Sequence, residues 1–115
     1  MEVQVSGRKV QLSPALREAV ETKLARLERF LRGEHRAEVV FLEERNGRIA
    51  AKRDVCEVLI DGSGDHLRAR VAAPDPFAAI DAAVTKLEHQ LQRAKDTVNR
   101  RGTGRRRASP NGAPS

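Results

Sequence analysis

Two segments of the chain repeat apolar residues every three or four positions, which is the period of a helix with one packed face. The first covers residues 14–32 and the second residues 75–101. Ser13-Pro14 and Asp75-Pro76 each place an N-cap residue before a proline, and Gly33 suits the end of the first helix. The predicted apolar stripes are Leu16, Val20, Leu24, Leu27 and Leu31 in the first helix, and Phe77, Ile80, Val84, Leu87, Leu91, Ala94 and Val98 in the second.

Four other segments alternate apolar and polar residues or are rich in β-branched ones, which is typical of strands. They cover residues 3–5, 36–43, 53–61 and 66–72. Asn46-Gly47 is a turn signal before the third strand, and residues 61–65 form a hairpin connection before the fourth. In the fourth strand we expect the inward side chains to be Leu67, Ala69 and Val71, and the outward ones His66, Arg68 and Arg70.

The order of these elements is β-α-β-β-β-α. A helix joins the first two strands in a right-handed crossover, so these strands should be parallel, while the others form an antiparallel meander. Each helix has a single apolar stripe, so both should pack on the same face of the sheet. The predicted fold class is therefore α+β, with a four-stranded sheet and two helices on one face.

Composition changes sharply after residue 101. Residues 1–101 hold all the predicted elements and are expected to form one domain. Residues 102–115 contain glycine, serine, proline and three consecutive arginines. Such a segment cannot bury enough apolar surface to fold, so we predict a disordered basic tail or the start of a linker.

The net charge of +6 makes nucleic acid the first partner to consider, because most of the 22 basic residues are arginines, which bind phosphate in a bidentate way. No apolar run reaches the length of about 20 residues that spans a bilayer. The first residues lack the basic and apolar regions of a signal peptide. The single cysteine, Cys56, excludes an internal disulfide framework. We therefore expect a cytoplasmic protein.

Each predicted helix gathers basic residues on one side. On the first helix, one flank of the apolar stripe is cationic and is expected to have no acidic partners. The second helix has a basic stripe away from its packed face. The alternative is that both are ordinary solvated surfaces. Because cations one helical turn apart match the spacing of backbone phosphates, we predict that the helices share a basic groove for RNA. Its candidate residues are Lys23, Arg26 and Arg29 on the first helix, and Lys86, His89, Arg93 and Arg100 on the second.

Other chemistries find little support in the sequence. His35, His66 and His89 lie in different elements, without cysteine or carboxylate at metal-ligand spacing, so neither metal nor another cofactor is expected. Cys56 is expected to be a buried small side chain. No glycine-rich loop precedes a helix to hold phosphate, so an enzyme is not expected. The three aromatic residues are all phenylalanine, which favours recognition of the backbone and shape of structured RNA over base stacking.

In their order along the chain, the motifs resemble the ribosome hibernation-promoting factors, also called ribosome-associated inhibitors. The resemblance rests on Gly7 after the first strand and on residues 12–18, LSPALRE, which lead into residues 23–30, KLARLERF. It continues with residues 77–81, FAAID, and residues 86–91, KLEHQL. It covers about residues 1–101.

The resemblance implies a fold similar in shape to a double-stranded RNA-binding domain. It also implies a stationary-phase or stress protein that binds the small ribosomal subunit between head and body. There the helices would face rRNA and occlude the sites of mRNA and tRNA, so that occupancy alone blocks translation. The family's rRNA-facing cations match Lys23, Arg26 and Arg29 on the first helix, and Lys86, His89 and Arg93 on the second. The alternative is a general binding module for double-stranded or structured RNA.

The chain departs from the family pattern at two residues. His89 stands where the family usually has arginine or lysine, so that contact should weaken as the pH rises above neutrality. Phe77 replaces the usual tyrosine and lacks its hydroxyl. Long members of the family continue through a linker into a domain that dimerises and pairs two ribosomes. Dimerisation is therefore expected only if such a domain follows in a longer protein.

Overall fold

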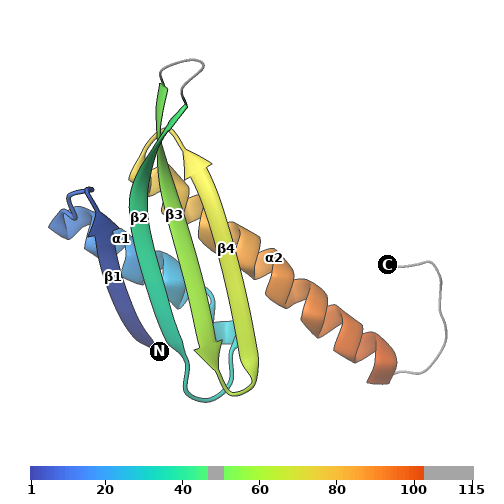
Figure 1. Cartoon of the computed structure of the whole chain (residues 1–115). Coiled ribbons are helices and arrows are strands. Elements are labelled where there is room, and N and C mark those ends of the chain that lie inside the picture. Colours follow the sequence, from blue (N-terminus) through green and yellow to red (C-terminus); the bar gives the residue numbers. More distant parts are fainter. Residues whose placement is uncertain (47–50, 103–115) are drawn as a thin grey trace.

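The computed structural model describes residues 1–46 and 51–102, and for residues 46, 51–52 and 96–102 it describes the backbone alone. The elements follow the order β1 (Glu2–Arg8), α1 (Pro14–Ala25), β2 (Arg36–Asn46), β3 (Ala51–Gly62), β4 (Asp65–Ala73) and α2 (Pro76–Gly102). A 3₁₀ turn, Glu28–Phe30, follows α1. The described chain has the predicted β-α-β-β-β-α order, and both helices lie on one face of the sheet (Figure 1).

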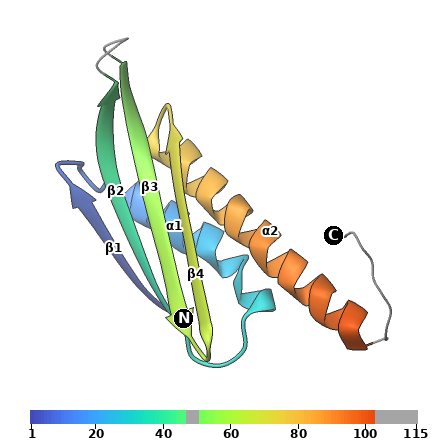
Figure 2. The same cartoon turned by 45° about the vertical axis from the view of Figure 1, so that its right-hand side comes forward.

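The sheet keeps the chain order, β1-β2-β3-β4, with β1 parallel to β2 and the other pairs antiparallel. The register places Val39 beside Val58 and Phe41 beside Cys56 on the face that the helices cover. Figure 2 shows α1 and α2 behind this face, with α2 next to β4. The α+β prediction is confirmed, including the parallel first pair.

The core lies between the sheet and the two helices. Buried residues of α1 and α2 repeat at helical spacing, as the sequence predicts, whereas β2 and β3 each contain consecutive buried residues, Val39-Val40-Phe41 and Val55-Cys56. Leu67 and Val71 of β4 are half-buried and Ala69 is buried, while His66 and Arg68 are exposed. The largest fully buried side chains are Phe41, Leu16, Leu24, Leu27, Ile60, Ile80, Leu87, Val20, Val39, Val55, Val58 and Val84.

The two helix starts form as predicted. The Ser13 hydroxyl accepts a hydrogen bond from the Leu16 amide at 3.1 Å, and the Asp75 carboxylate accepts one from the Ala78 amide at 2.9 Å. The predicted end of the first helix at residue 32 is wrong. The amides of Arg26 and Leu27 bond to carbonyls three residues back, at 3.1 and 2.9 Å, so the α-helix tightens and stops. This tightening still buries Leu27.

Two predicted members of the α2 apolar stripe are not packed. Phe77 is 46% exposed. At 100° per residue it lies within about 20° of the buried Val84, so its exposure follows from its place in the first turn of α2, which begins at Pro76, and not from its position round the helix. Ala94 is also exposed, because α2 projects beyond the sheet at its C-terminal end (Figure 1). The side chain of Val98 lies outside the described residues, as do the Gly47 turn signal and residues 103–115.

A buried histidine joins the loop before β2 to the β3–β4 hairpin. The His35 side chain is 1% exposed, and its Nε2 lies 2.8 Å from Asp65 Oδ2. Its Nδ1 lies 3.3 Å from the Gly33 carbonyl. Gly62, at φ 146°, is required here because a Cβ atom would lie 2.2 Å from the Glu34 carbonyl oxygen. The hairpin thereby closes one end of the sheet.

Candidate nucleic-acid interface

Lys23 of α1 and Arg26, the residue that follows α1, lie close to two acidic side chains of α2. Lys23 Nζ lies 2.9 Å from Asp81 Oδ1. The Arg26 guanidinium donates to Glu88 Oε1 at 2.5 Å and to Glu88 Oε2 at 3.3 Å, and its Nη1 lies 3.4 Å from Asp81 Oδ1. The prediction that this flank has no acidic partner is therefore wrong for both cations. Their partners come from the other helix, 55 and 62 residues away along the chain for Arg26.

The ion pairs shift the pKa values of their members. Hydrogen bonding from Arg26 is the main cause that lowers the pKa of the Glu88 carboxyl, and hydrogen bonding from Lys23 is the main cause for Asp81. The pKa of Arg26 is raised, chiefly by its hydrogen bond to Glu88. Glu88 has a side chain only 18% exposed, against 50% for Asp81, so the Arg26–Glu88 pair is the less screened of the two contacts.

We expect Asp81→Asn with Glu88→Gln to lower stability by about 1 kcal/mol or less at pH 7, because exposed ion pairs contribute little. Both carboxyl pKa values are lowered in the folded protein. Their contribution is therefore complete above the unfolded pKa of about 4 and disappears as the pH falls through the folded values. Melting curves from pH 7 to pH 3 should show the difference from the unchanged chain shrinking toward zero. A difference that is constant with pH would contradict this origin.

Arg29 lies beyond the end of α1, in the 3₁₀ turn. Its side chain is exposed, and its guanidinium carbon lies 4.7 Å from the centre of the neighbouring Phe30 ring. This cation–π contact leaves the N–H groups of the guanidinium in solvent. Arg29 is close enough to Glu88 to help lower the pKa of that carboxyl, so it lies on the same side of the helical layer as Arg26.

Lys86, His89 and Arg93 of α2 are exposed. Lys86 follows Asp81 by five residues and Arg93 follows Glu88 by five, which is a rotation of about 140° round the helix. Lys86 and Arg93 therefore lie on the flank of α2 away from α1, and His89, about 80° round the helix from Asp81, lies between the two flanks. The structure brings the six cations to one helical layer, with Lys23 and Arg26 on the α1 side of α2 and Lys86 and Arg93 on its far side. The shared groove stays a prediction, and the Arg100 side chain lies outside the described residues.

Within this basic row, Gln90 has a structural role. Its side-chain amide donates to the Arg68 carbonyl at 3.3 Å, which ties α2 to the edge of β4. This contact and the buried apolar stripe of α2 together orient the helix against the sheet. The row Lys86, His89 and Arg93 is consequently held on the solvent side of α2.

The opposite face of the sheet pairs its arginines with acids of neighbouring strands. Arg70 contacts Glu57 at 2.9 Å and Glu44 at 3.2 Å, and Arg36 lies 3.6 Å from Glu2. Among the described side chains of this face, cations and carboxylates alternate, so they form no continuous positive surface. The helical layer is the better candidate for a polyanion.

Metal-binding groups do not gather in residues 1–45 and 53–95, where side chains are described: no cluster of three histidine, cysteine, aspartate or glutamate side chains could hold an ion. Cys56 is fully buried, and burial raises the pKa of its thiol to about 12. A thiol with this pKa is not a nucleophile at neutral pH. Among the described residues, no helix is long and apolar enough to cross a membrane.

Comparison with known protein families shows to which family the chain belongs. The family described as "Sigma 54 modulation protein / S30EA ribosomal protein" matches residues 3–99. The chain belongs to this family. The resemblance to hibernation factors drawn from the sequence motifs is thereby confirmed, because S30EA relatives carry that name.

Two S30EA relatives differ in how much of them the chain covers. The "Ribosome hibernation promotion factor" of Mycobacterium tuberculosis is 38% identical over 95 residues, which are 83% of this chain but only 43% of that protein. The "Ribosome hibernation promoting factor" of Salmonella typhimurium is 32% identical over 98 residues, 85% of this chain and 97% of that protein. The chain thus spans less than half of the first relative and nearly all of the second.

Solved structures of S30EA relatives have the same fold. The N-terminal domain of Thermus thermophilus Protein Y superposes with a TM-score of 0.68 at 35% identity, covering 81% of this chain and 98% of that one. A ribosomal subunit interface protein from Coxiella burnetii gives a TM-score of 0.65 at 26% identity, covering 84% and 99%.

Sequence reasoning missed the two acidic residues of the interface. Asp81 and Glu88 are seven residues apart, so they lie on one flank of α2, and this spacing was the available signal. The residues near α1 that they contact depend on how the two helices cross, and the sequence of a single helix does not determine this crossing.

Proposed function

We propose that this chain is a ribosome hibernation factor. It binds the small ribosomal subunit near the decoding region and blocks translation by occluding the sites of mRNA and tRNA. The observation that carries this proposal is the match over 97% of the Salmonella relative named as a hibernation promoting factor. It blocks translation by occupying the site and needs no catalytic chemistry, cofactor or metal. We propose that it acts in the cytoplasm.

The exposed cations support rRNA as the ligand. Lys86, His89 and Arg93 would contact phosphates directly from the exposed side of α2. Lys23 and Arg26 would exchange their carboxylate partners for phosphate oxygens, which keeps both cations paired but costs the ion pairs and leaves the Asp81 and Glu88 carboxylates to solvent. Arg29 and Arg100 would extend the two flanks. Counterion release from several phosphates then makes the affinity fall steeply with salt.

Co-sedimentation with ribosomal subunits tests the proposal. A hibernation factor should saturate at about one copy per small subunit and bind naked RNA duplex much more weakly. A general structured-RNA module, the alternative, should load in several copies and bind the duplex equally well. Loading without saturation would contradict the proposal, and an affinity that does not change with salt would point to a protein partner instead.

A further inference from the structure

The outer edge of β1 is open. β1 is the first strand of the sheet, and in the described residues its only strand neighbour is β2. The Glu2 amide donates to the His35 carbonyl at 3.0 Å, so the backbone groups of Glu2 point toward β2. Alternate residues of a parallel strand bond to one neighbour, so Glu2, Gln4 and Ser6 face β2. The amides and carbonyls of Val3, Val5 and Gly7 therefore point to the open side.

The other edge of the sheet is protected, which sets β1 apart. On β4, Gln90 of α2 donates to the Arg68 carbonyl at 3.3 Å, and Arg53 donates to the Ala72 carbonyl at 3.4 Å. These side chains occupy the acceptors that another strand would need. Across the described part of the chain, no side chain bonds to the outward backbone groups of β1.

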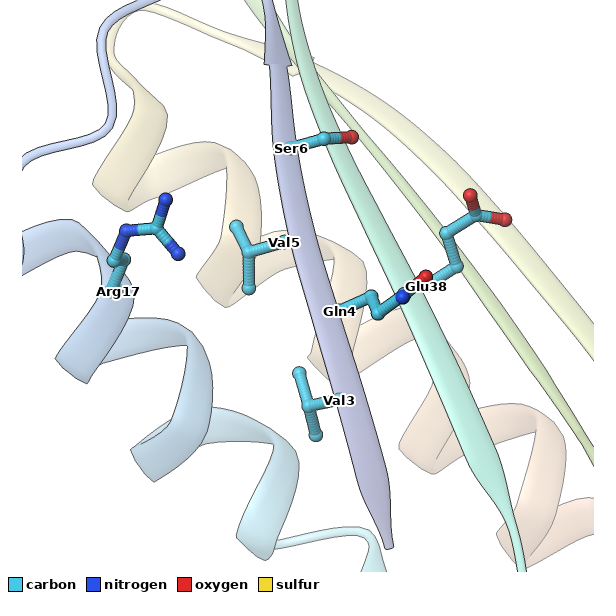
Figure 3. Close-up of a pocket in the computed structure, with 6 residues that line it drawn as sticks. All are labelled: Val3, Gln4, Val5, Ser6, Arg17 and Glu38. Atoms are coloured by element: carbon cyan, nitrogen blue, oxygen red, sulfur yellow. The ribbon is translucent and has the colours of Figure 1, made fainter.

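A groove of about 490 Å³ follows the open edge. Its residues come from β1, from Arg17 of α1 and from Glu38 of β2 (Figure 3). Val3 and Val5 are half-buried and point toward α1, and Arg17 reaches back toward Val5. The groove thus combines two apolar side chains with a row of backbone donors and acceptors, which is what an added β-strand requires.

We propose that this edge pairs with β1 of a second copy of the chain, in antiparallel orientation and centred on Val5. The strand is complementary to itself in that register: Val5 faces Val5 of the second copy, Val3 faces Gly7, Gln4 faces Ser6, and Glu2 faces Arg8. The outward groups of Val3, Val5 and Gly7 meet each other as hydrogen-bonded pairs, so the ladder has the correct phase.

The charges favour this register over its neighbours. Two symmetric Glu2–Arg8 contacts would close the ends of the paired strands on the face away from the helices. Arg8 has no ion pair in the described chain, and Glu2 is held only by Arg36 at 3.6 Å, with both side chains more than 70% exposed. A shift by one residue would place side chains of the helix-covered face beside side chains of the opposite face. A shift by two residues would place Glu2 opposite Ser6 and remove its contact with Arg8.

The pairing is expected to be weak. A seven-residue edge buries much less than the roughly 1,600 Å² of a standard interface, so we expect a dissociation constant on the order of 100 µM. The inference does not rest on the proposed function, because neither Glu2 nor Arg8 belongs to the cations proposed to bind RNA. A dimer and a ribosome ligand can therefore be tested separately.

A charge exchange across the pair tests the proposal by sedimentation velocity between about 10 µM and 1 mM. Glu2→Arg alone and Arg8→Glu alone each oppose like charges twice, and each should weaken dimerisation about tenfold. An equimolar mixture of the two variants makes both contacts complementary again and should dimerise like the unchanged chain. Melting curves verify that each variant is folded.

Cross-linking tests the register. Gln4→Cys mixed with Ser6→Cys should form a disulfide between the two variants, whereas Gln4→Cys alone should not link to itself. The native thiol does not interfere, since Cys56 is buried with a raised pKa. A chain that stays monomeric at about 1 mM, or a mixture no more dimeric than either charge variant alone, would overturn the proposal.

Discussion

Lys86→Gln with Arg93→Gln is expected to weaken small-subunit binding about 100-fold at moderate salt. Each side chain is exposed on the outer flank of α2, and a hydrogen bond from a cation to phosphate contributes about 1.5 kcal/mol or more. The slope of log affinity against log salt should fall by about two, because two fewer phosphates release counterions. Binding isotherms at several salt concentrations measure both quantities.

The matched control is Arg36→Gln with Arg68→Gln. It removes the same two charges from the sheet face away from the helices, where Arg36 and Arg68 are exposed. Its affinity should change little. Because Arg93 also contacts the rest of the chain, melting curves of both double variants are needed to separate binding from folding. An equal loss in the two would mean that net charge, and not the α2 flank, governs binding.

Phe41→Ala is expected to destabilise the domain by about 3–5 kcal/mol, which would lower its melting temperature by more than about 12 °C. The Phe41 ring is 1% exposed, and its strand register places it between Gly7 of β1 and Cys56 of β3. Removing the ring leaves a cavity that the surrounding strands and helices cannot close.

Phe77→Ala is the matched control, because the same side chain is removed from a surface position. At 46% exposure it should lower stability by about 1 kcal/mol, well below the loss at Phe41. Thermal melts of the two variants compare the sites directly. A Phe77→Ala variant as unstable as Phe41→Ala would mean that the ring packs against the core after all, as its sequence period suggested.

The sequence was sufficient for the elements and their layering, because each depends on local periodicity or on caps. Ser13 and Asp75 mark the helix starts through hydrogen bonds within a single turn, which a short motif determines. The end of α1 was not predictable in the same way. Leu31 continues the helical period, yet the backbone tightens at Arg26 and Leu27, and that change depends on how Leu27 packs into the finished core.

The candidate interface was predictable only as a list of cations. Lys23 and Arg26 stand without acids on their own helix, so reasoning within one helix leaves them unpartnered. Their pairing with Asp81 and Glu88 arises from the distance and crossing of α1 and α2 on the sheet. The same crossing puts Lys86 on the far flank of α2, which helical periodicity alone could not relate to α1.

Competition with initiator tRNA and mRNA tests the central claim most directly. In the co-sedimentation assay, small subunits loaded with both ligands should exclude the chain, and increasing amounts of the chain should displace both with the stoichiometry of a single site. The Lys86→Gln with Arg93→Gln variant should require about 100-fold more protein for the same displacement. Simultaneous binding of the chain, initiator tRNA and mRNA to one subunit would contradict occlusion of the decoding region.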